Sequence, residues 1–157
     1  MTKDEMRTLK ITSNLLLVYG IFIFLYAILY FFINLYAVIW GSFWLYEYFF
    51  FLGLLVHVGF TLILVFGSFM LIHARKLLQE HNILGCTGGI FGLLIVVLPM
   101  LYSFPTIFDL LDDLGYLGKF LGFLFPVWIF FNFITFYLLF SVKATLKSEK
   151  RKNPTHS

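Results

Sequence analysis

Four long, almost uninterrupted apolar stretches constrain the fold of this chain more than any other feature of its sequence. They run from about Asn14 to Trp40, Phe49 to Ile72, Leu84 to Phe104 and Phe120 to Val142. A helix needs about 20 apolar residues to cross the ~30 Å hydrocarbon core of a bilayer, and each stretch is long enough. Lipid forces the backbone to satisfy its own hydrogen bonds, and the stretches lack the alternation of barrel strands. The sequence therefore predicts an all-α integral membrane protein with four transmembrane helices.

The composition supports this class. Of the 157 residues, 61% are hydrophobic and only 12% are charged, whereas a soluble domain carries ~25% charged residues. So little charge cannot cover a water-facing surface, which excludes a soluble domain, a disordered chain and a nucleic-acid-binding module. A chain of this length predicts a single membrane domain over residues 1–157. The one cysteine, Cys86, cannot form a disulfide within the chain.

The basic residues indicate how the spans are oriented. Ten of the 11 Lys and Arg residues lie before the first stretch, between the second and third, or after the fourth; only Lys119 lies on the opposite side. The positive-inside rule then predicts cytoplasmic N- and C-termini, and we expect the cell membrane as the location. The tail, 143–157, is expected to lack regular structure. Its cations either serve only as topology determinants or also contact anionic headgroups; they are Lys143, Lys147, Lys150, Arg151 and Lys152.

The connections between the stretches are short, so consecutive spans should pack as antiparallel neighbours in a four-helix bundle. The link from Pro105 to Gly118 has apolar residues on one side of a helical wheel and Asp109, Asp112 and Asp113 on the other. This pattern predicts a short amphipathic helix lying on the outer leaflet between spans three and four. The three carboxylates are expected to face water, and a divalent-cation site is the alternative.

The third stretch carries glycines at helical spacing, which predicts a face for close helix packing. They are Gly85, Gly88, Gly89 and Gly92. Small residues let two helix backbones approach closely within a membrane. We expect these glycines to pack against the second or fourth span of the same chain. A seam between two copies of the chain is the alternative.

A few polar residues lie inside the spans and should turn toward the bundle interior. His57 is the one ionisable residue well away from both ends of its span, and an intramembrane ionisable residue is a functional-site hypothesis by default. We predict one polar cluster, serving either as hydrogen bonds between helices or as the lining of a small cavity: Tyr30, Asn34, His57, Thr61 and Asn132. One histidine without other ligands does not indicate a metal or haem, so no metal and no cofactor are expected.

The sequence contains no recognisable catalytic motif, neither a phosphate-binding glycine loop nor a metalloprotease or nucleophile-elbow pattern. We therefore predict a non-enzymatic accessory or scaffold subunit that binds another membrane protein, or a second copy of itself, through helix packing. The alternative is a small oligomeric transporter or channel whose pathway passes His57 and Asn132. A third hypothesis is an enzyme that acts on lipids through the outer aspartates.

Overall fold

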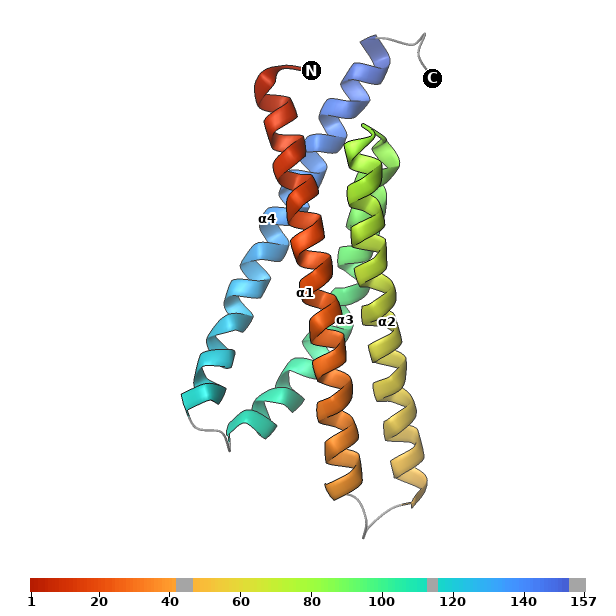
Figure 1. The fold of residues 1–157 in the computed structure, drawn as a ribbon, viewed down its shortest axis with the longest axis vertical. Helices are drawn as coiled ribbons and strands as arrows, with labels where there is room; N and C mark the ends of the chain where they lie inside the picture. Colours follow the sequence, from red (N-terminus) through yellow and green to blue (C-terminus); the bar gives the residue numbers. More distant parts are fainter. Residues whose placement is uncertain (42–46, 113–115, 153–157) are drawn as a thin grey trace.

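The fold consists of four long helices joined by short connections (Figure 1). The computed structural model describes the backbone of residues 1–41, 47–112 and 116–152, and the side chains of residues 1–35, 54–101 and 127–151. The helices are α1 (Lys3–Gly41), α2 (Glu47–Gln79), α3 (Ile83–Asp112) and α4 (Tyr116–Lys152). The described residues contain no strand.

All four helices are long and apolar enough to cross a membrane, which confirms the predicted all-helical, four-span class. Their outward faces are apolar as well: Val18 is 65% exposed, Leu98 73% and Phe133 72%. Exposed apolar side chains around the whole bundle would be unfavourable in water but are expected where the surroundings are lipid. The structure therefore supports a multi-pass membrane protein.

The helices extend beyond the apolar stretches that predicted them. At the start of α1, the Thr2 side chain accepts a hydrogen bond from Glu5 N (3.3 Å), and the Glu5 carboxylate accepts one from Thr2 N (2.6 Å). This reciprocal pair is a capping box, which favours helix initiation well before the apolar residues begin. It also explains why α1 begins at Lys3 although its apolar stretch begins near Asn14.

The tail does not match the prediction that it lacks regular structure. α4 continues as a helix through Lys152. Val142 (3% exposed) and Leu146 (6%) lie one turn apart, and with Leu9 of α1 they belong to the same buried core. The charges of the tail predict an irregular segment, but this apolar i, i+4 pair anchors the extension of α4 to the bundle.

α3 runs without a break through Pro105 to Asp112, so residues 105–112 continue the third helix and do not begin a new one. A proline inside a membrane helix is tolerated where neighbouring groups satisfy the freed carbonyl. The side chains of residues 102–126, including the three aspartates, lie outside the described residues. An amphipathic helix on the outer leaflet therefore stays a prediction.

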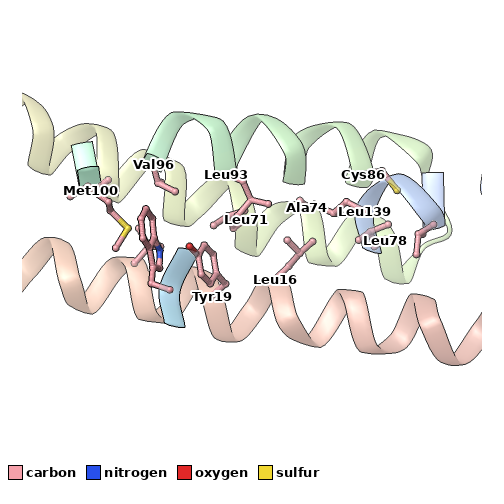
Figure 2. Packing of buried hydrophobic residues seen from close by; sticks show 14 of the residues in the cluster. Leu16, Tyr19, Leu71, Ala74, Leu78, Cys86, Leu93, Val96, Met100 and Leu139 are labelled. Atoms are coloured by element: carbon pink, nitrogen blue, oxygen red, sulfur yellow. The ribbon is translucent and has the colours of Figure 1, made fainter. Parts of the chain in front are cut away.

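The helices alternate in direction, and both termini lie at the same end of the bundle as the α2–α3 turn (Figure 1). α2 packs extensively on both α1 and α3. α4 crosses obliquely and contacts α1 and α3, but within the described residues it does not pack on α2. Fully buried leucines from all four helices form the centre of the bundle. Figure 2 labels one from each helix, in the order α1 to α4: Leu16, Leu71, Leu93 and Leu139.

The α2–α3 turn has a defined backbone geometry. Asn82 N donates to Leu77 O (2.9 Å) and His81 N to Leu78 O (3.0 Å), the bond pattern of a Schellman motif at a helix C-terminus. His81 has φ 56°, the left-handed conformation that glycine usually supplies at this position. The Asn82 side chain then accepts a hydrogen bond from Leu84 N (3.0 Å) and caps α3.

Candidate functional site

The glycine face of α3 packs inside the chain, and its closest approach is at Gly85. A Cβ atom added there would lie 2.7 Å from Leu78 N and 2.8 Å from Ala74 O, both backbone atoms of α2. Only a residue without a side chain fits so close to another backbone. Gly88, three residues later, is less constrained, since its nearest neighbour would be the Ala74 Cβ at 3.7 Å.

The other two glycines of α3 also face neighbouring helices of the same chain. A Cβ at Gly92 would contact Leu71 of α2 at 3.0 Å, and one at Gly89 would contact Leu139 of α4 at 3.1 Å. Gly67 of α2 faces back toward α3, where an added Cβ would clash with the Val96 side chain. The glycine face thus brings α3 against α2 and α4, and the chain itself occupies it.

Two members of the predicted polar cluster form a direct bond between helices. The Tyr30 hydroxyl of α1 is hydrogen-bonded to Nδ1 of His57 on α2, at 2.6 Å, and the rings are 5.7 Å apart. Tyr30 is fully buried, whereas the His57 side chain is half-buried. No described residue bonds the second ring nitrogen, Nε2. The pair therefore fixes the imidazole while leaving it one hydrogen-bonding atom.

Asn34 and Thr61 flank this pair, but their hydrogen bonds to described residues stay within their own helices. The Asn34 amide donates to the Tyr30 carbonyl oxygen (2.8 Å), and the Thr61 hydroxyl donates to the His57 carbonyl oxygen (2.9 Å). Such i to i−4 bonds satisfy a polar side chain in lipid without a partner helix. Both residues border the Tyr30–His57 bond and add no tie of their own between α1 and α2.

The structure places Asn132 beside Tyr19 and not beside His57. The Tyr19 hydroxyl lies next to the side chains of Asn132 and Trp128 on α4. Asn132 donates to the Trp128 carbonyl oxygen (3.0 Å). The Tyr19 hydroxyl and the Asn132 side-chain oxygen are buried and reach hydrogen-bond geometry with no described residue. The predicted cluster is thus divided into two sites: Tyr30, Asn34, His57 and Thr61 between α1 and α2, and Asn132 with Tyr19 and Trp128 between α1 and α4.

The prediction omitted Tyr19, although the sequence contains a signal for it. Tyr19 precedes Tyr30 by 11 residues, three helical turns, so both lie on one face of α1 about 16 Å apart. At this separation the two tyrosines can contact two different neighbouring helices, at two depths in the membrane. The sequence does not tell which helix faces which tyrosine.

The predicted headgroup cations lie along the final turns of α4. Lys143 is half-buried, whereas Lys147, Lys150 and Arg151 are exposed, and the side chain of Lys152 lies outside the described residues.

The thiol of Cys86 is fully buried. Within the described part of the chain, no three His, Cys, Asp or Glu residues gather closely enough to hold a metal ion.

Comparison with known proteins assigns no relative to the chain: no family model, no curated protein and no solved structure matches it.

Proposed function

We propose that this chain is a non-enzymatic accessory subunit of the cell membrane that binds another membrane protein laterally, through the face of α2 that carries His57. The observation behind this proposal is the half-buried imidazole, held by Tyr30 through Nδ1 with Nε2 unbonded among the described residues. An unsatisfied polar atom in lipid is costly, so a neighbouring helix with a hydrogen-bonding group would be stabilised there.

The packing of the glycines supports the choice of this face. Gly85, Gly89 and Gly92 are in contact with the chain's own helices, so they are not available to a partner. We propose that both termini lie in the cytoplasm, in line with the placement of the cations.

Native mass spectrometry of the protein, extracted gently from its own membrane, tests this function. We expect a reproducible complex with a different membrane protein, reduced in His57→Leu and unchanged in Phe133→Leu, a matched change at an exposed site on α4. A complex that His57→Leu leaves intact, or no complex at all, contradicts the proposal.

The alternative, a small oligomeric transporter or channel, draws on a different observation. The Tyr19 hydroxyl and the Asn132 side-chain oxygen are buried inside the bundle without a hydrogen-bond partner among the described residues. Buried polar atoms of this kind also occur where a polar solute or water passes through a membrane protein. On this alternative, liposomes that contain the pure protein pass protons or a small solute, and Asn132→Leu abolishes the flux. An absence of flux in the wild-type protein rejects it.

A further inference from the structure

Two polar side chains near the end of the bundle that carries the termini take part in none of the interactions described so far. Arg75 on α2 is half-buried, and its Nε atom is buried without a hydrogen-bond partner. Ser13 on α1 is 1% exposed, and its hydroxyl is also buried without a partner. A buried donor that bonds nothing costs free energy, and the cost is larger when the group is charged.

Helix geometry brings these two residues to a similar level of the α1–α2 interface. Gly20 of α1 faces Ser68 and Ile72 of α2, since a Cβ added there would lie 3.1 Å from Ser68 O and 2.8 Å from Ile72 Cγ1. Ser13 precedes Gly20 by seven residues, and Arg75 follows Ser68 by seven. Seven residues are two turns, or about 10 Å along a helix, and return to the same face. Because α1 and α2 are antiparallel, both steps lead to the same level of the α1–α2 interface.

None of the described residues supplies a negative charge to Arg75 there. The α1 residues facing this level are Thr12 and Ser13, which are neutral, and α4 contributes Lys143, which lies near Cys86 of α3. Four carboxylate side chains are described. Asp4 and Glu5 lie in the first turn of α1, two or more turns before Ser13. Glu149 pairs with the amino group of Met1, and Glu80 is exposed in the α2–α3 turn. Arg75 takes part in no ion pair among the described residues.

We propose that Arg75 and Ser13 bind the phosphate group of a phosphate ester at the membrane surface. The Nε–H and one terminal N–H of a guanidinium form a planar fork that matches two phosphate oxygens. The Ser13 hydroxyl can donate a third hydrogen bond from α1. The negative charge of the ester compensates the arginine, and the surrounding basic residues favour anionic membrane lipids as its source. A soluble phosphate ester has the same chemistry and is the other source.

Lipid retention by the purified full-length chain tests this site. Phosphatidylglycerol is added, and bound lipid is counted by native mass spectrometry. Arg75→Lys keeps the charge but loses the fork, and we expect roughly tenfold weaker retention, the loss of one charge-assisted hydrogen bond. Ser13→Ala should weaken retention about threefold, the loss of a neutral hydrogen bond. The matched controls, Lys76→Arg and Ser148→Ala at exposed positions, should retain lipid like the wild type.

Competition experiments then identify the source of the phosphate group. Competition by glycerol phosphate would indicate a soluble phosphate ester, whereas retention that glycerol phosphate does not reduce would indicate the lipid; both support a phosphate site. Oleate, a carboxylate without phosphate, should not compete. The proposal is overturned if Arg75→Lys and Ser13→Ala retain lipid like the wild type, or if oleate binds as well as phosphatidylglycerol. Thermal unfolding with and without lipid provides a second readout, because bound lipid should raise the Tm of the wild type more than that of Arg75→Lys.

Discussion

At the scale of single residues, the side chains of Tyr30 and His57 form a hydrogen bond between α1 and α2. Tyr30→Phe should destabilise the protein by about 0.6 kcal/mol and at most ~1.7 kcal/mol, the range measured for hydrogen bonds between membrane helices. Unfolding by a denaturing detergent measures this. Thr61→Val, which removes a bond within one helix, is the control and should change stability less.

A double-mutant cycle separates the bond from the packing of the two rings. Tyr30→Phe and His57→Leu should together cost less than the sum of their single effects, because either change alone already removes the bond. Additive effects would mean that the 2.6 Å contact does not contribute to stability.

His81 supplies a second prediction at this scale. Its left-handed φ of 56° is unfavourable for a residue with a Cβ atom, and glycine adopts it without this cost. His81→Gly should therefore stabilise the protein by about 0.5–1 kcal/mol. Glu80→Gly, one residue earlier, where no positive φ occurs, should destabilise it instead. If both changes destabilise the protein equally in the same unfolding experiment, the strain argument is contradicted.

The polar residues show what a sequence can predict at this scale. Depth in the membrane, counted from the ends of the apolar stretches, predicts that Tyr30 and His57 lie close together, and the structure joins them. The same count groups Asn132 with them, but the structure places it beside Tyr19. Depth alone does not say which helices touch, and α4 does not pack on α2 within the described residues.

At the scale of the helices, the glycines of α3 determine how closely α2 and α3 approach. Gly85→Ala places a methyl group within 3 Å of two backbone atoms of α2, so the helices must separate. We expect a destabilisation of about 1–3 kcal/mol, typical of overpacking. The matched control is Gly88→Ala, whose nearest neighbour is at 3.7 Å; it should be neutral or stabilising by up to ~1 kcal/mol, because alanine favours a helix.

The ends of the helices were harder to predict than their centres. Hydropathy marks the part of a helix inside lipid, but a helix continues as long as its caps and packing allow. The capping box at Thr2 and Glu5 and the buried Leu146 extend α1 and α4 into their charged flanks. In α3, a proline that suggests a helix start lies within an unbroken helix. The capping box and the i, i+4 pair of Val142 and Leu146 are local signals that the sequence contains. The unbroken helix at Pro105 depends instead on neighbouring groups, which periodicity and charge do not encode.

At the scale of the whole molecule, both termini and the α2–α3 turn lie at one end of the bundle (Figure 1). If that end is cytoplasmic, single cysteines introduced by His81→Cys or Ser148→Cys, in a Cys86→Ala background, should react with an impermeant thiol reagent only after the cells are opened. Ser42→Cys, in the link between the first two spans, should react in intact cells. The opposite labelling pattern would reverse the orientation.

The close contacts between α2 and its two neighbours also bear on the order in which the chain assembles. Gly20 meets Ile72, Gly67 meets Val96 and Gly85 meets Leu78, so all these partners have been synthesised by the time residue 96 is added. At about 5–20 residues per second, Trp128 follows roughly 2–6 s later. α1, α2 and α3 can therefore associate during translation, while α4 joins last and completes the buried surroundings of Tyr19. During this interval the α1 face that will meet α4 is open to the lipids and insertion factors around the nascent chain.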